Sequence, residues 1–217
     1  MTRLAKILIA GTALLILPAN LACAQQNNDV ANILNGKVDL KSDVSNLNTQ
    51  ISNVAGNVNG TSTAGGNNVE VFTMNNTNVL NKQYVGSGAD IVATQNADVQ
   101  NVGGTVTLQS QAICNAADIS TDPSNVNVKS SQVCDSTDPY ASLNANVNNA
   151  GNDVTLSSVA EGNSFSEDTN APNTNIINRQ TNNSAEYAVV NSTISNVNGN
   201  VTVNATAIGN NAQIIHY

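Results

Sequence analysis

The stretch Asn196-Val-Asn-Gly-Asn-Val-Thr-Val-Asn-Ala-Thr-Ala207 decides the fold. Its first half sets a glycine among asparagines, and this composition favours turns because both residues accept positive φ. From Val201 onward, apolar residues alternate with polar ones, which is the pattern of a half-buried strand. The stretch therefore predicts a turn that leads into a strand.

The same turn-and-strand pattern occurs four times along the chain. Its glycines are separated by 48, 47 and 48 residues, and an alanine and an asparagine follow each glycine at similar distances. With Asp153 interpreted as one inserted residue, such regularity predicts a stack of similar structural units. The expected repeat turn positions are Gly56, Gly104, Gly151, Gly199, Asn67, Asn115, Asn163 and Asn210.

A period near 48 residues fits one large unit, or two coils of about 24 residues each. Residues 78–83 recur at 175–180, and 125–132 occupy the corresponding place between two glycine motifs. Along 106–114 the expected inward residues change from Val and Leu to Ser, Ala and Cys, which predicts a narrow interior. We expect an all-β fold, a repetitive β-solenoid or stacked β-sheet with about four repeats.

The first 24 residues resemble a secretory signal peptide. Arg3 and Lys6 precede an apolar run over 7–17, and Ala22-Cys23-Ala24 is a small-residue cleavage site. We expect cleavage after Ala24, with lipidation at Cys23 as the alternative. Removal of the leader's two bases leaves 15 acidic and 7 − 2 = 5 basic residues, a net charge of −10.

The remaining chain divides into two expected parts. Residues 25–52 are an N-terminal cap or a short helical segment, and 53–217 are the β-repeat array. The helical alternative comes from apolar residues spaced 3, 4 and 3 apart between Val44 and Val54. The cap alternative comes from the need of a solenoid for a polar end. Residues 164–175 are polar and predict an exposed loop.

Two cysteines, Cys114 and Cys134, follow the expected leader. An even number of cysteines in an exported protein predicts a disulfide, which would here join adjacent layers. The alternative is two separate buried thiols. The acids around them match no calcium-binding loop and are interpreted as solvated side chains. These acids are Asp118, Asp122, Asp135 and Asp138.

The composition argues against catalysis and against nucleic-acid binding. The chain has 15 acidic and 7 basic residues, no tryptophan, and a single histidine, His216, next to its last residue. Enzyme sites commonly need clustered histidines, acids or metal ligands, and phosphate neutralisation needs a basic face. We therefore expect no enzyme activity, no cofactor, no metal and no nucleic-acid partner.

Residues 197–212, Val-Asn-Gly-Asn-Val-Thr-Val-Asn-Ala-Thr-Ala-Ile-Gly-Asn-Asn-Ala, resemble repeats of bacterial surface-fibre proteins. They look most like the curlin type of repeat and the holdfast-anchoring proteins of stalked bacteria. The resemblance extends over residues 50–215 in composition and rhythm. It implies export through an outer-membrane pore, a location at the cell surface or outside the cell, and assembly into β-rich, amyloid-type fibres.

Together these features predict a structural cell-surface protein that forms, caps or anchors an adhesive extracellular fibre. Residues 196–215 carry no charged side chain, which suits an open sheet edge that receives another strand. The expected partners are further copies or related fibre subunits, an outer-membrane secretion pore and a surface polysaccharide. The alternative is a non-assembling adhesin or carbohydrate-binding β-repeat module that presents Asn and Thr ladders to sugars.

Overall fold

The computed structural model describes residues 22–23, 31–35, 39–73, 77–121 and 126–217, and these ranges contain strands and connections without a helix. The strands form two parallel sheets. The first sheet has the order β1 (Ala22–Cys23), β4 (Val58–Thr73), β6 (Val106–Thr121), β9 (Val154–Thr169) and β12 (Val201–His216). The second sheet contains β2 (Ala31–Asn35), β3 (Asp39–Val54), β5 (Thr77–Val102), β7 (Val126–Cys134), β8 (Thr137–Ala150), β10 (Thr174–Asn182) and β11 (Tyr187–Val197).

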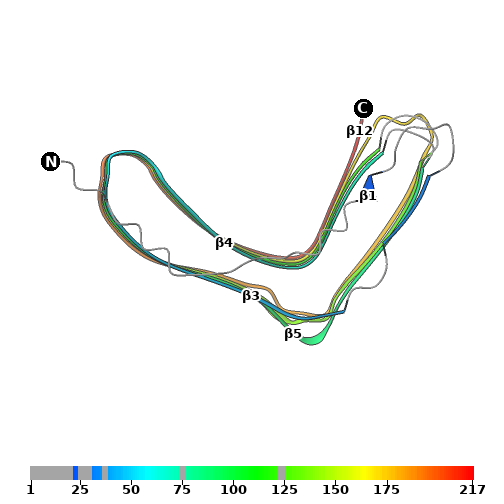
Figure 1. The fold of residues 1–217 in the computed structure, drawn as a ribbon, viewed down its shortest axis with the longest axis horizontal. Coiled ribbons are helices and arrows are strands. Elements are labelled where there is room, and N and C mark those ends of the chain that lie inside the picture. The colour runs from blue at the N-terminus through cyan, green and yellow to red at the C-terminus, as the bar shows by residue number, and fades with distance from the viewer. Residues whose placement is uncertain (1–21, 24–30, 36–38, 74–76, 122–125) are drawn as a thin grey trace.

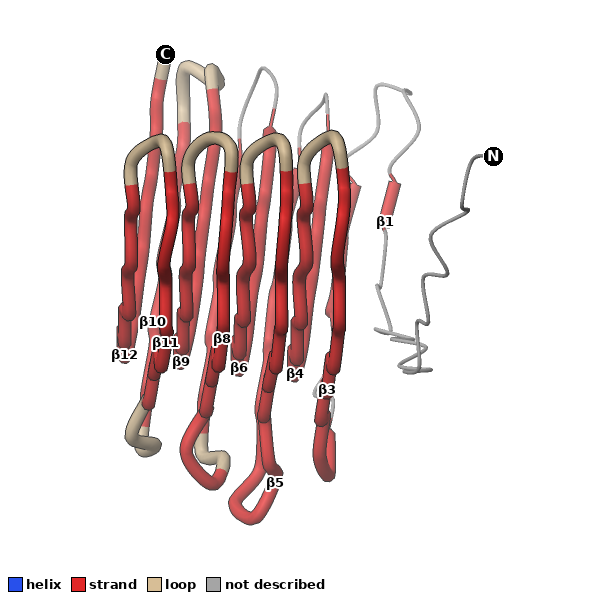
Figure 2. The backbone as a smooth tube through the Cα atoms, turned by 90° about the vertical axis from the view of Figure 1, so that its left-hand side faces the viewer, coloured by secondary structure: helices blue, strands red, loops and turns tan. Residues whose placement is uncertain are grey.

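Each pass of the chain crosses the first sheet and then the second, and it follows a bent path that successive passes repeat (Figure 1). We call these passes layer 1 (58–102), layer 2 (106–150) and layer 3 (154–197). β2 and β3 make an N-terminal half-layer in the second sheet, and β12 makes a C-terminal half-layer in the first. The turns that join consecutive layers stand in one row (Figure 2).

One 48-residue repeat makes one layer, so the alternative of two 24-residue coils is wrong. Asn78, Asn127 and Asn175 are register partners in the second sheet, and the segments that begin near them recur once per layer. These segments lie midway between the glycine motifs because the first half of each layer lies in the first sheet and the second half lies in the second sheet. Parallel strands need a long crossover connection, which the opposite sheet supplies here. The expected all-β fold is confirmed, and the structure adds that its strands are parallel.

Asparagines in the left-handed region begin the turns between layers. The φ angles of Asn53, Asn101, Asn149 and Asn196 lie between 54° and 62°. Ordinary L-residues seldom adopt this conformation, and asparagine tolerates it better than most. The turn motif of the sequence thus has a direct backbone cause.

The glycines of these turns align differently from the expected pattern at one place. The amide of Gly151 bonds to the carbonyl of Val102, and Asn152 bonds to Gly104, so Asn152 is the partner of Gly104. Gly151 therefore lies one position earlier in its turn than Gly56, Gly104 and Gly199. The turn before Val154 has no insertion, so the interpretation of Asp153 as an inserted residue is wrong.

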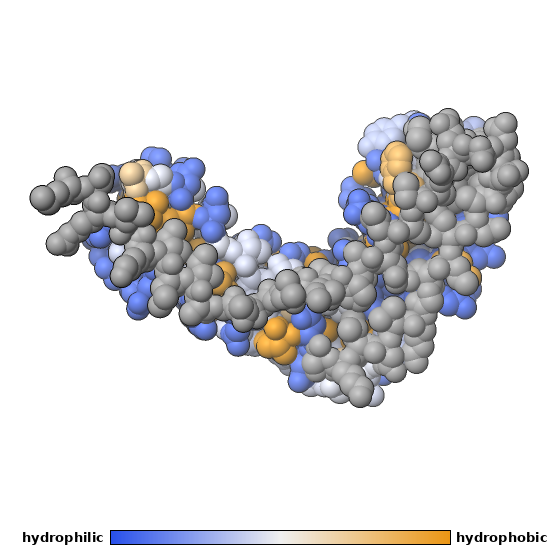
Figure 3. Space-filling view, in the orientation of Figure 1, coloured by the Kyte–Doolittle hydropathy of each residue, from blue (hydrophilic) through white to orange (hydrophobic). Residues whose placement is uncertain are grey.

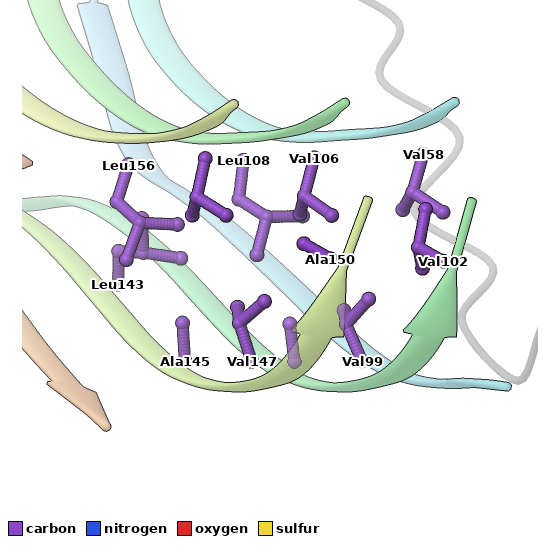
Figure 4. Packing of buried hydrophobic residues seen from close by; sticks show 12 residues of the cluster. Val58, Val99, Val102, Val106, Leu108, Leu143, Ala145, Val147, Ala150 and Leu156 are labelled. Atoms are coloured by element: carbon purple, nitrogen blue, oxygen red, sulfur yellow. The ribbon is translucent and has the colours of Figure 1, made fainter. Parts of the chain in front are cut away.

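The core lies between the two sheets and is narrow, as the small inward residues predict. Near the turns, Leu108 and Leu156 of the first sheet point toward Leu143 and Val147 of the second (Figure 4). Farther along lies a cluster of mostly small side chains around Ala112. A third cluster around Phe165 fills the end distant from the turns. The size of the inward residues therefore differs between the three clusters along the strands.

Two expectations about local structure are wrong. Residues 39–54 form β3, not a helix, because their backbone groups pair with β5 along the whole strand. Residues 164–169 belong to β9, so the expected exposed loop begins only after Thr169. In both segments, pairing with a neighbouring layer overrides the local pattern. A membrane-crossing helix is absent from the described part of the chain.

Candidate assembly edge and amide ladders

A ladder of four asparagines runs through the interior of the first sheet. The Nδ2 of Asn67 donates to the Oδ1 of Asn115 at 2.7 Å, and Asn115 donates in the same way to Asn163 at 2.8 Å. Asn163 then donates to Asn210 at 2.7 Å. These positions are inward-facing strand residues and not turn residues, which corrects the sequence-based assignment. A row of amides is tolerated inside because each rung satisfies the next.

Each inner rung also ties the two sheets together. The side-chain amide also donates to a backbone carbonyl of the second sheet. The distances from Nδ2 to the carbonyl oxygen are 3.2, 2.9 and 2.9 Å for Asn67, Asn115 and Asn163. Those carbonyls belong to Tyr84, Val133 and Thr181. Both donors of the amide are therefore used in every full layer.

A glutamine ladder makes the reverse connection from the second sheet. The Nε2 of Gln132 donates to Gln83 at 2.7 Å, and Gln180 donates to Gln132 at 2.9 Å. Each glutamine also donates at 2.7 Å to a carbonyl of the first sheet, that of Ala116, Ser164 or Asn211. These glutamines were not among the predicted site residues, although a Gln ends each of the three segments 78–83, 125–132 and 175–180.

The predicted disulfide between Cys114 and Cys134 is present, with Cα atoms 5.9 Å apart. It joins the two sheets within layer 2, whereas the expectation was a link between adjacent layers. The register places Val85 of layer 1 and Asn182 of layer 3 beside Cys134. Layer 2 is the only full layer with a covalent cross-link between its described sheets.

One buried acid lies at the far end of the interior. The side chain of Glu167 is fully buried, and the hydroxyl of Thr121 donates to its Oε1 at 2.9 Å. Its Oε2 has no partner within the described residues. The pKa of Glu167 is raised to about 7, mainly by burial; the hydrogen bond from Thr121 lowers it, and the charges of Asp168 and Asp118 add to the rise. Burial also raises the pKa of Glu161 and Glu186.

A second asparagine ladder lies on the outer face of the second sheet. Asn96 donates to Asn48 at 2.7 Å, Asn144 to Asn96 at 2.8 Å, and Asn191 to Asn144 at 2.9 Å. This ladder borders an open groove of about 1340 Å³ that crosses the layers and whose only charged lining residue is Asp98. The space-filling view shows the bent outline of the stack, with hydrophilic residues along much of its rim (Figure 3).

The C-terminal half-layer has no layer beyond it among the described residues. Val201, Val203 and Ile214 are about half exposed, and this strand continues in register with β9 up to His216. The Nε2 of His216 lies 2.9 Å from the carbonyl oxygen of Ala171, so the end of the chain is an ordered strand. An edge strand without charged side chains lacks a feature by which proteins commonly prevent pairing with a further strand.

The described residues hold no group of three or more His, Cys, Asp or Glu side chains that could bind a metal ion. Asp118, Asp135 and Asp138 therefore belong to no such group. Asp122 lies outside the described residues.

Comparison with known proteins gives one informative result. The sequence model of a family described as holdfast attachment protein D matches residues 22–216. Neither the curated proteins nor the solved structures contain a match. The family match supports the holdfast-anchoring resemblance and not the curlin-type one.

Proposed function

We propose that the chain, which belongs to the holdfast attachment protein D family, forms, caps or anchors an adhesive fibre at the cell surface. Its role in holdfast-associated adhesion follows from the family, as does a cell-surface or extracellular location. The proposal adds a mechanism in which an open β-solenoid receives further strands edge to edge. The protein is structural and catalyses no reaction.

The observation that carries this proposal is the uncovered C-terminal edge. β12 offers unpaired backbone groups along 16 residues, and no charged side chain lies between 196 and 215. Its half-exposed Val201, Val203 and Ile214 would each contribute about 1 kcal/mol if another layer covered them. Natural proteins usually protect such an edge with charges or proline, and this one does not.

Assembly of the purified protein tests the proposal. We expect concentration-dependent fibres that bind thioflavin and appear in electron micrographs, at neutral pH and moderate salt. A Val203→Asp variant places a charge on the exposed row and should keep the protein monomeric, whereas Asn204→Asp on the opposite face of the same strand should not. A wild-type protein that stays monomeric at high concentration contradicts the proposal.

The expected partners in the cell are further copies or related fibre subunits, together with an outer-membrane secretion pore. The leader-like residues 1–24 support export of the chain. Deletion of the pore should retain the protein inside the cell envelope. Its appearance at the surface without the pore would contradict this part.

A second candidate function is binding of a surface polysaccharide without self-assembly. The outer groove favours it, because Asn96 and Asn144 repeat amide groups at each layer across a wide polar surface. Sugar hydroxyls pair readily with such amides. Monomeric protein that binds holdfast polysaccharide, and loses binding in Asn144→Ala, would favour this function over fibre formation.

A further inference from the structure

We infer that copies of this chain join head to tail, and that Asn210 of one copy and Asn67 of the next form the rung that sets the direction. This inference rests on the proposed function and names its partner as a second copy of the chain. It follows from three features of the two ends of the stack.

The first feature is that each end holds half of a layer. At the C-terminal end, β12 lies in the first sheet without a following strand in the second. At the N-terminal end, β2 and β3 lie in the second sheet, and only β1, two residues long, accompanies them in the first. A second copy placed beyond β12 would add its β2 and β3 to complete one layer, and its β4 would pair with β12.

The second feature is the polarity of the inner asparagine ladder. Every rung donates toward the C-terminal end, so Asn210 accepts from Asn163 and has no described acceptor for its own Nδ2. At the other end, the Oδ1 of Asn67 is buried and has no hydrogen-bond partner. One end of the ladder thus offers donors and the other an unused acceptor.

The register supplies the second acceptor as well. In full layers the asparagine donates to the carbonyl of Tyr84, Val133 or Thr181. The partner of Tyr84 in the N-terminal half-layer is Asp39, whose carbonyl would occupy the same place in the shared layer. Asn210 would then donate to Asp39 and Asn67 of the next copy, and repeat the bonding of each interior rung.

The third feature is the position of the expected leader. β1 pairs with Val71 and Phe72 at the edge of β4, where β12 of the preceding copy would dock. Its residues, Ala22 and Cys23, lie within the segment that cleavage after Ala24 would remove. β1 pairs with two of the 16 residues of β4, so removal of the leader would clear this part of the edge for the neighbouring copy.

A head-to-tail contact joins two different surfaces and leaves both ends of a chain of copies open, so it propagates. A symmetric contact between two C-terminal ends would stop at a dimer. It would also place the donors of two Asn210 side chains against each other.

Asn210→Asp tests the inference because it changes only the outward half of the rung. The aspartate keeps an oxygen for Asn163 but loses both donors and sets a charge against the Oδ1 of Asn67. We expect unchanged circular dichroism and melting temperature of the monomer, and a critical concentration for assembly raised about tenfold or more. Asn204→Asp, with the same charge change on the outer face of β12, should assemble like the wild type.

Mixing the variant with wild-type protein tests the direction. The Asn67 end of Asn210→Asp is intact, so the variant should add to a growing fibre and then end it. About one variant copy in ten should shorten the fibres markedly, as expected for heterologous growth. A symmetric contact would give dimers instead of fibres, and fibres whose length the variant leaves unchanged would overturn the inference.

The remaining outcomes separate the inference from the proposed function. If the wild-type protein never assembles, this result contradicts the proposed function itself. Wild-type and Asn210→Asp proteins that assemble equally overturn the inference alone. If Asn210→Asp does not fold, Asn210→Leu removes both donors without adding charge and should block assembly in the same way. Assembly of a folded Asn210→Leu protein at the wild-type concentration would overturn the inference.

Discussion

β9 and β12 are partners in register from Val154 and Val201 to Thr169 and His216, yet their side chains have different surroundings. Val154 and Leu156 are 0% exposed, whereas Val201 and Val203 are each 49% exposed. Both strands begin with the same alternation of apolar and polar residues, although β9 contains three acidic residues and β12 contains none. Among the described residues, β9 lies between two strands of the first sheet, whereas β12 has a neighbouring strand on one side only.

In a stacked fold, the burial of a side chain depends more on the neighbouring layers than on the sequence of its own strand. The Asn163 rung of β9 makes three side-chain hydrogen bonds, and the matching Asn210 rung of β12 makes one. The end of the stack is therefore an interior strand that lacks its next layer. Nothing in β12 marks it as a protective cap.

The largest expected effect is the loss of an interior rung. Asn163→Ala removes one acceptor and two donations, and it leaves the groups around it unsatisfied in the core, which should cost about 3 kcal/mol or more. Asn210→Ala, the matched change in β12, removes one bond at an exposed position and should cost about 1 kcal/mol or less. Urea unfolding of both variants measures the difference, and equal losses would contradict the contrast between the two strands.

The disulfide should have the next largest effect. Replacing Cys114 and Cys134 together by alanine removes a cross-link over 20 residues, which the chain-entropy model values at about 3 kcal/mol. Local hydrogen exchange should rise in layer 2 more than in layer 3, where no cross-link exists. Exchange that rises equally in both layers would show that the bond stabilises the whole stack.

The smallest effect is a pH dependence from Glu167, which lies beside Ile214 of β12 in the register. Its pKa is raised from 4.5 to about 7 in the folded protein, so folding favours the protonated carboxyl. Stability from this group is therefore greatest below pH 4.5 and falls as pH rises through about 7.

Glu167→Gln keeps an oxygen for the hydroxyl of Thr121 and cannot ionise. We expect it to raise the melting temperature at pH 8 and to change it little at pH 4.5. Calorimetry at both pH values checks the prediction. An equal change at the two pH values would show that the substitution acts through packing and not through charge. The Asp168→Asn variant controls for the loss of a neighbouring negative charge.

Much of the fold could be predicted because its pattern repeats. The inward alternation of 106–114 is confirmed, since Val106, Leu108 and Ala112 are fully buried or nearly so. The turn asparagines could be found because their conformation depends on a few neighbouring residues. The cysteine pair was predicted from number and compartment, which need no three-dimensional information.

Other features could not be predicted from the sequence because they depend on contacts with residues about 48 positions away along the chain. The inner asparagines resemble turn residues locally, and only the bonds from Asn67 to Asn115 and onward make them interior residues. Glu167 lies in a polar segment that resembles a loop, but pairing of β9 with β6 and β12 buries it. The spacing of Val44 to Val54 suggested a helix, and pairing with β5 made it a strand.

The sequence by itself determined the class of the molecule: a repeating, aromatic-poor β-chain whose alternation and turn residues act over short distances. Only the tertiary structure decided which asparagines face inward, which layer carries the cross-link and which end stays open. The reason is physical. Alternation and turn preference are properties of neighbouring residues, whereas the environment of a side chain in a stack depends on the layers above and below it.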